Sequence, residues 1–238
     1  MKTKFFSKYI IQNTRNKLNQ NLEVCTFNLK DFNRAIKYNI SRIELCASKD
    51  VGGISPEKED IIYATSKGIP IYPIVRPRPG NFSYSNKEIQ NMINYISFCK
   101  EYGCKGIVFG ILNSENGIDI SNCKKLIKES EGMSKTFHMA FDLAKDSFIS
   151  MEKIIDLGFD RILTSGKETS AIKGKDLIKE LAIKGHNRIS VMPGLKLRSD
   201  NIDTFNRDEN IYEYHSSCYV NNSFSESELR RIIKKVSN

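Results

Sequence analysis

The chain has 238 residues and a formal net charge of +9, with 37 lysines and arginines against 28 aspartates and glutamates. Its hydrophobic fraction of 39% is sufficient for a folded core, which excludes a wholly disordered chain. No run of about 18 apolar residues occurs, so no transmembrane helix is predicted. Lysines are mixed with acidic residues in stretches such as KKLIKESE. We therefore interpret the positive charge as a solvated surface rather than as a nucleic-acid site.

The six cysteines do not form closely spaced pairs, and no CxxC motif occurs. This spacing argues against a disulfide framework and against a zinc site. A reducing compartment such as the cytoplasm is therefore expected.

Residues 1–21 are predicted to be a short basic N-terminal extension. The first twenty residues contain five basic residues and no acidic residue. They lack the apolar core of a secretory signal, and they contain few of the serines, alanines and arginines typical of a transit peptide. We interpret this segment as a solvated tail or a short extra helix, followed by one domain at 22–238.

From residue 22 onward, short apolar runs alternate with amphipathic stretches, which predicts eight strands and eight helices. The expected strands are 22–26, 42–46, 71–76, 106–110, 135–138, 161–164, 188–192 and 211–215. The expected helices are 29–38, 56–67, 87–102, 121–130, 148–157, 176–184, 198–205 and 226–236. In the second helix, Ser55 is the expected N-cap and Pro56 the first helical residue.

Alternating strands and helices are typical of a parallel sheet, because parallel neighbours need a long crossover connection. We predict an α/β protein with a single (β/α)8 TIM barrel. A doubly wound open sheet is the alternative. It is disfavoured because no GxGxxG or GxxxxGK[ST] motif follows the first strand. The strand starts SRI, DRI and NRI also repeat one unit, as a barrel would.

Two predicted strands carry a glutamate followed by a cysteine, in LEVC at 22–25 and IELC at 43–46. In a barrel, one set of alternating residues faces the helices and the other faces the lumen. By this parity the lumen collects Glu23, Glu44, Glu213, Arg76, His138 and His215. Most of them lie at the C-terminal ends of strands, where the active sites of barrels lie. A functional site and a self-paired polar core are both compatible with this set.

Cys25 and Cys46 end neighbouring parallel strands, so we expect them at matching heights on chains about 4.8 Å apart. Two thiols this close could bind a soft ion such as Cu(I). Buried cysteine is also an ordinary small hydrophobe, and spacing alone does not decide between these roles. Packing or surface positions are expected for Cys99, Cys104, Cys123 and Cys218.

Six motifs occur in order: LEVC, RIELC with GGISP at 52–56, RPRPGNFSYS at 76–85, FHMAFD at 137–142, DRILTSG at 160–166 and VMPG at 191–194. Together they resemble the copper homeostasis protein CutC family over residues 22–217. The resemblance implies a (β/α)8 barrel that is usually cytosolic, self-associates and has a role in copper handling. In some members it implies Cu(I) binding through the cysteines that match Cys25 and Cys46.

The chain departs from the family pattern in three motifs. Met139 stands where the family usually has arginine, and Leu195 and Lys196 stand in a turn that is usually rich in glycine. Pro79 and Asn81 replace a glycine and an aspartate. A glycine-rich turn lets backbone N–H groups approach a phosphate, so phosphate binding is less expected here. Strand parity also allows Met139 to pack outward against a helix.

Three functional hypotheses follow. In the first, a copper homeostasis protein holds Cu(I) through Cys25 and Cys46, with His138 or His215 as further donors. In the second, a barrel enzyme of unknown reaction acts on a small anionic metabolite. The third is a scaffold without a small ligand.

The second hypothesis assigns roles at the barrel mouth. The expected ligand-binding residues are Arg76, Arg78, Glu23, His215 and Ser165. The expected acid–base residues are Glu44, His138 and Asp142. In either functional case the partner is a copper ion or a small molecule rather than a nucleic acid or a membrane.

Overall fold

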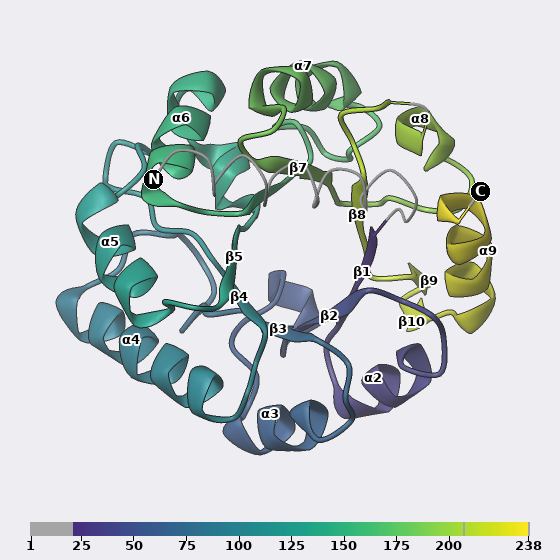
Figure 1. The fold of residues 1–238 in the computed structure, drawn as a ribbon, viewed down its shortest axis with the longest axis horizontal. Helices are drawn as coiled ribbons and strands as arrows, with labels where there is room; N and C mark the ends of the chain where they lie inside the picture. The colour runs from purple at the N-terminus through teal and green to yellow at the C-terminus, as the bar shows by residue number, and fades with distance from the viewer. Residues whose placement is uncertain (1–20, 207, 238) are drawn as a thin grey trace, which may run out of the picture.

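Eight short parallel strands lie around a common axis, and helices surround them on the outside (Figure 1). The computed structural model describes residues 21–206 and 208–237. The strands are β1 (Asn21–Thr26), β2 (Arg42–Leu45), β3 (Ile71–Pro73), β4 (Gly106–Phe109), β5 (Ser134–Phe137), β6 (Arg161–Thr164), β7 (Ser190–Pro193) and β8 (Glu213–Ser216). The predicted N-terminal extension lies outside the described residues, except for Asn21, which begins β1.

A helix follows each strand of the barrel. These helices are α2 (Leu29–Ala35), α3 (Lys58–Thr65), α4 (Asn86–Glu101), α5 (Ile120–Glu129), α6 (Ser147–Leu157), α7 (Lys175–Gly185), α8 (Asp203–Asn206) and α9 (Glu226–Val236). Two 3₁₀ turns, η1 (Lys49–Val51) and η2 (Met139–Leu143), and a small hairpin of β9 (Tyr219–Val220) and β10 (Ser223–Phe224) lie in the loops. The predicted (β/α)8 architecture is confirmed.

The strands pair as two four-stranded parallel sheets, in the orders β3-β2-β1-β8 and β4-β5-β6-β7. A parallel bridge between Ile74 and Val108 joins the sheets on one side. There the Val75 N–H donates to the Val108 carbonyl at 2.8 Å. On the other side β7 and β8 lie next to each other (Figure 1). The ring therefore places all eight carboxyl ends at one mouth.

The second predicted helix begins later than its sequence suggests. We expected Ser55 as N-cap and Pro56 as the first residue, but α3 begins at Lys58 with Glu57 in the cap position. Ser55 has a different partner, because its hydroxyl accepts the Arg76 N–H at 2.9 Å and its own N–H donates to the Arg76 carbonyl. Ser55 therefore holds the segment that follows β3 instead of capping the helix.

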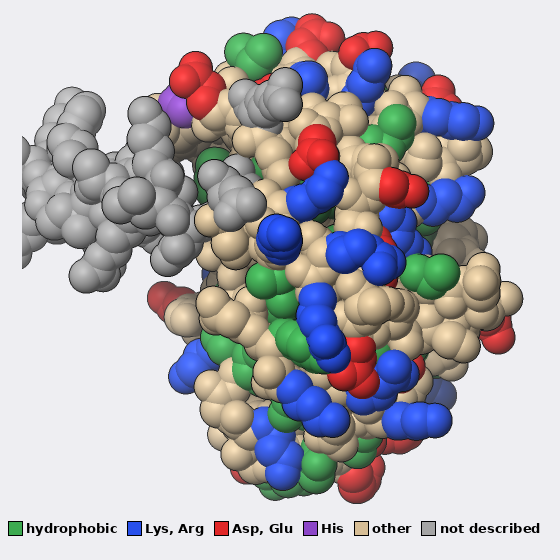
Figure 2. Space-filling model, turned by 90° about the vertical axis from the view of Figure 1, so that its right-hand side faces the viewer, with side chains coloured by type: hydrophobic (Ala, Val, Ile, Leu, Met, Phe, Trp, Pro, Cys, Tyr) green, Lys and Arg blue, Asp and Glu red, His purple; other side chains and the backbone are tan. Residues whose placement is uncertain are grey.

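On the face of the molecule that includes α9, the positive charge is not gathered in one dominant patch. Figure 2 shows lysine and arginine side chains spread over this face with acidic side chains among them. This distribution is what a solvated surface predicts. Among the described residues, no helix combines the length and the apolar character needed to cross a bilayer.

The barrel interior contains a buried ion-pair network. Arg42 on β2 donates to Glu23 at 2.5 Å and to Glu213 at 2.7 Å. The second oxygen of Glu213 accepts from Arg161 on β6 at 3.2 Å. All four side chains are buried, and Arg42 and Arg161 each lie over the ring of Tyr72. Two of the three predicted inward acids, Glu23 and Glu213, are thus paired with arginines that begin strands.

We expect Arg42→Met to destabilise the fold by about 3–5 kcal/mol, because it leaves two buried carboxylates without their shared cation. Urea unfolding at pH 7 measures this change. Arg188→Met is the control, because Arg188 pairs with Glu152 in an exposed ion pair whose loss should change stability little. Equal losses in the two variants would contradict a dominant role for the lumen network.

Candidate functional site

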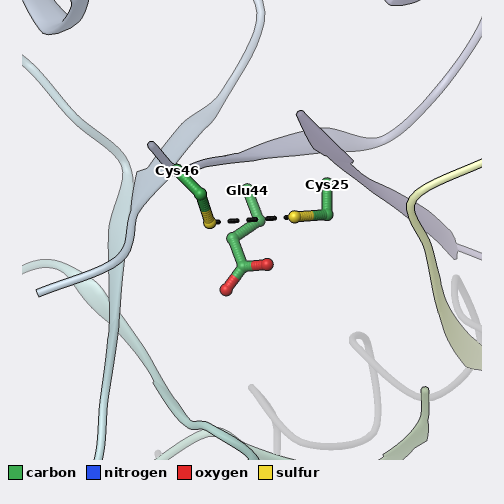
Figure 3. Close-up of side chains that lie close together, drawn as sticks. All are labelled: Cys25, Glu44 and Cys46. Atoms are coloured by element: carbon green, nitrogen blue, oxygen red, sulfur yellow. Dashed lines mark hydrogen bonds between the residues drawn. The ribbon is translucent and has the colours of Figure 1, made fainter. Parts of the chain in front are cut away.

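The thiols of Cys25 and Cys46 meet inside the barrel, with their sulfur atoms 3.7 Å apart (Figure 3). Cys25 lies on β1 and Cys46 directly follows β2, and each is 3% exposed. The prediction of matching heights is wrong, because Cys25 is in register with Glu44 and Cys46 lies further along. The stagger between tilted barrel strands causes this offset, and the side chains meet diagonally.

Glu44 lies between the two thiols in the view of Figure 3. One carboxylate oxygen of Glu44 and the sulfurs of Cys25 and Cys46 all lie within 4.8 Å of one another. Phe27, Ile74 and other apolar side chains pack around the cysteines, so two sulfurs and one oxygen converge among mainly apolar neighbours.

Both thiols are protonated in the free protein. Burial raises the pKa of Cys46 to about 12 and raises the pKa of Cys25 well above its ordinary value, where Cys46 and Glu44 act in the same direction. Neither side chain is therefore a reactive thiolate at neutral pH. A metal ion that binds here must displace the thiol protons, which couples binding to proton release.

His215 connects the thiol site to the ion-pair network. Its Nδ1 lies 2.8 Å from a Glu23 oxygen, and its Nε2 lies 3.7 Å from Glu44. Burial opposes a charged imidazole, but the Glu23 hydrogen bond and the charge of Glu44 outweigh it and raise the pKa of His215. Burial raises the pKa of Glu44. The pKa of Glu23 falls to about 2, because Arg42 and His215 outweigh the effect of its burial.

A cavity of about 530 Å³ opens at the carboxyl ends of the strands, above the thiol site. Five predicted site residues line it: Cys25, Glu44, Arg76, His138 and His215. Its size is within the range of small-molecule sites. The barrel mouth therefore combines a sulfur pair at its base with a space that a metabolite can enter.

Arg76 is a buried cation in the wall of this cavity. Its Nη1 donates to the carbonyls of Val51 and Gly53, both at 2.8 Å, and its Nη2 donates to the Gly80 carbonyl at 3.0 Å. These neutral acceptors fix the guanidinium without neutralising its charge. The Nε–H is buried, and the buried hydroxyl of Tyr84 interacts with the same guanidinium.

His138 is a neutral donor in the same wall. It precedes η2, and its Nδ1 accepts the Ala140 N–H at 3.2 Å, so the proton of the neutral ring is on Nε2. Burial, with help from Arg76, lowers the pKa of His138 to about 3. The Nε2 atom is buried and unpartnered among the described residues. His138 is thus better suited to donate a hydrogen bond than to act as a base or to ligate a metal.

Comparison with known proteins identifies this barrel. Residues 20–220 match the model of the CutC family. The chain belongs to the CutC family. A protein named family protein CutC from Pasteurella multocida (strain Pm70) is 40% identical over 197 residues, which cover 82% of this chain and 81% of that protein.

Solved structures support the same assignment. A crystal structure from Streptococcus agalactiae, provisionally named copper homeostasis protein CutC, has a TM-score of 0.78 and 34% identity, and covers 83% of this chain and 98% of that chain. An aldolase named QR15 has a TM-score of 0.66 over 92% of this chain and 96% of that chain. Its 12% identity shows likeness of fold alone.

Five residues with predicted roles in this CutC-family protein do not line the cavity: Glu23 and Cys46, whose contacts are described above, and Arg78, Asp142 and Ser165. Arg78 pairs with Glu88 at 2.5 Å and donates to nearby loop carbonyls. Asp142 accepts from the N–H and hydroxyl of Ser165 and from the Lys167 N–H, at 2.9 to 3.0 Å. These contacts hold the loops after β3 and β6. Their predicted roles in ligand binding and acid–base chemistry stay untested.

The alternation of inward and outward residues along the strands did not predict several residues of the site. Arg42 shares the inward parity of Glu44, so the same rule could have identified it as the partner of the acids. Met139 lines the cavity, because β5 ends at Phe137 and parity no longer applies in η2. The other four cysteines, by contrast, are all buried, which fits the predicted packing role and excludes a surface role.

The loop after β7 keeps a backbone that favours glycine. Leu195 and Lys196 have φ angles of 70° and 57°, and both line the cavity. Side chains other than glycine adopt this conformation at a cost, and such positions concentrate at functional sites. The two residues expected to depart from the family turn therefore carry large side chains on a left-handed backbone that glycine adopts most readily.

The stability of the barrel should fall in acid. Two arginines lower the pKa of Glu213 from 4.5 to about 2 against its burial. Glu213 therefore contributes roughly 3 kcal/mol above pH 4.5, and this contribution is lost as the pH falls from 4.5 toward 2. Urea unfolding of the parent and Glu213→Gln from pH 7 to pH 3 should show a difference that shrinks with falling pH. Glu152→Gln, in an exposed pair, is the control, and a constant difference for Glu213→Gln would refute this account.

Proposed function

We propose that this CutC-family protein binds Cu(I) through the thiolates of Cys25 and Cys46. The distance of 3.7 Å between the two sulfurs carries the proposal, because one ion can contact both atoms with little movement. Thiolates are soft ligands that favour Cu(I) over oxygen-seeking ions such as Mg²⁺. The copper homeostasis name of the Streptococcus agalactiae structure supports the same role.

The environment of the thiols also supports a soft monovalent ion. Apolar side chains, among them Phe27, Ile74 and Val108, surround the pair. Nδ1 of His215 is paired with Glu23, and Nδ1 of His138 accepts the Ala140 N–H while its Nε2 carries the proton. We therefore assign the ion to the two sulfurs, with Glu44 as the nearest charged neighbour, and we do not assign a histidine ligand.

We place this function in a reducing compartment such as the cytoplasm. All six cysteines are free thiols, including the close pair of Cys25 and Cys46. Disulfides are rare where the cellular thiol pool keeps cysteines reduced. A copper site of two thiols needs the same conditions, because oxidation would remove both ligands. Self-association stays an expectation from the family resemblance.

Reduced protein should take up about one Cu(I) per chain. The double variant Cys25→Ser with Cys46→Ser should lose this uptake, because it removes both soft ligands. Metal analysis after anaerobic titration against a Cu(I) chelator measures the stoichiometry. Cys123→Ser is the control, because Cys123 is a buried thiol on the outer helix α5. Uptake that survives the double variant would remove this pair from the ligand set.

A second candidate function is binding or catalysis of a small metabolite in the cavity above the thiols. The cavity of about 530 Å³ favours it, because a site for one buried ion does not need a space of this size. Glu44 and His215 line its base and form the coupled pair best placed for proton transfer. Arg76 and His138 provide hydrogen-bond donors in the wall.

The role of Glu44 can be separated from that of an ordinary acid. Glu44→Gln should weaken the thermal stabilisation given by small phosphorylated or carboxylated metabolites that raise the Tm of the parent. Glu59→Gln should not, because Glu59 lies exposed on α3. Melting of the unliganded variants runs beside this screen, since removing one member of a buried charged set can cost about 3–5 kcal/mol. A Glu44→Gln variant that melts and binds like the parent would show that Glu44 contributes neither to ligand binding nor to stability.

A further inference from the structure

We propose that the cavity wall at Arg76 and His138 is a binding site for an oxyanion, the phosphate or carboxylate group of a small ligand. The site uses the buried guanidinium of Arg76 and the imidazole of His138, which both line the cavity. This proposal rests on the second candidate function and deepens it, because it names the part of the ligand that is recognised. An absence of catalysis would therefore not contradict anion binding.

The charge of Arg76 is the first argument. Its side chain is only 6% exposed, and in the described part of the chain its guanidinium donates to the carbonyls of Val51, Gly53 and Gly80 rather than to a carboxylate. Arg42 and Arg161, also buried in this barrel, are both paired with acids. A buried charge without a counter-ion is costly. An anion in the adjoining cavity supplies the missing charge.

The hydrogen-bond inventory is the second argument. His138 is 4% exposed, and its buried Nε2–H has no partner among the described residues, whereas the Arg76 guanidinium interacts with the buried hydroxyl of Tyr84. The two groups flank one ring: the Arg76 guanidinium carbon lies 4.8 Å from the Phe82 centroid, and the His138 and Phe82 centroids are 4.8 Å apart. The unpartnered Nε2 atom of His138 carries a proton, so a group that pairs with it must be an acceptor, as an oxyanion is.

The rest of the lining favours the same charge. Lys49, Lys196 and Arg198 line the cavity together with Arg76, and Glu44 is the one acidic residue in the described lining. Arg198 donates to the carbonyls of Leu197 and Tyr219 and to a serine hydroxyl, so it too has no carboxylate partner among the described residues. A cleft lined mainly by one sign of charge concentrates ligands of the opposite sign.

The position of Glu44 orients the ligand. Glu44 lies on a barrel strand within 4.8 Å of Cys25 and His215, whereas Lys49 and Lys196 belong to the loops after β2 and β7. An oxyanion at Arg76 and His138 therefore leaves the body of the ligand in the remaining space. This arrangement fits a small metabolite with one anionic end better than a free inorganic ion, although inorganic phosphate is a suitable first probe.

The test measures binding of inorganic phosphate and, separately, of acetate to the full-length reduced protein by isothermal titration calorimetry at low salt. At least one of the two should bind saturably and more weakly as NaCl rises. The stronger of the two identifies phosphate or carboxylate as the preferred group. Absence of saturable binding for both would overturn the proposal.

Variants locate the site. Arg76→Gln and Lys196→Glu should weaken the affinity at least tenfold. Lys196 is exposed and its side chain has no hydrogen bond or ion pair among the described residues, so Lys196→Glu should fold even if Arg76→Gln does not. Lys105→Glu is the matched control, since Lys105 is exposed and precedes β4 at the opposite end of the barrel. Equal loss in Lys196→Glu and Lys105→Glu would show unspecific charge binding and overturn the site.

Copper binding is tested independently in the same set of proteins. Lys196→Glu should take up Cu(I) like the parent, and the double variant Cys25→Ser with Cys46→Ser should retain phosphate or acetate binding. Loss of copper uptake therefore leaves the anion site standing, and loss of anion binding leaves the copper proposal standing.

Discussion

The ion pairs of Arg42 with Glu23 and Glu213 are the constraint on which the barrel interior depends. A barrel usually fills its lumen with branched apolar side chains, but here the lumen carries charges that must be paired. Glu213 also accepts from Arg161, so the network connects β8, in one four-stranded sheet, with β6 in the other. Electrostatic pairing across the lumen thus complements the backbone hydrogen bonds of each sheet.

This network also determines the chemistry of the mouth. One oxygen of Glu23 accepts from Arg42 and the other faces His215, which extends to Glu44 beside the thiols. The polar chain ends there, and the cysteines are surrounded by apolar groups that keep them protonated. Arg76 lies outside this chain and keeps an uncompensated charge. A single mouth therefore presents two separate environments, one neutral and sulfur-rich, the other cationic.

The sequence predicted the fold because alternation operates over the whole chain, and it predicted Glu23, Glu44 and His215 inside because parity operates along each strand. It did not predict the offset of Cys25 and Cys46, since stagger depends on closure of the ring. The contact of Ser55 with Arg76 depends on a residue far along the chain. The tautomer of His138 depends on the backbone that follows the strand. Such tertiary contacts override local preference, and local rules cannot reveal them.

The turn after β7 shows how a departure from the family pattern can alter a site without removing it. Leu195 and Lys196 hold left-handed backbone conformations that cost non-glycine residues energy, of order 1 kcal/mol or more each. The turn is held from outside: the Leu195 carbonyl accepts the Ala171 N–H, and the Lys196 carbonyl accepts from Asn201. Glycines at these positions would let a ligand approach the backbone. Here the same backbone places a lysine side chain in the cavity lining, which adds positive charge where a glycine would have left open space.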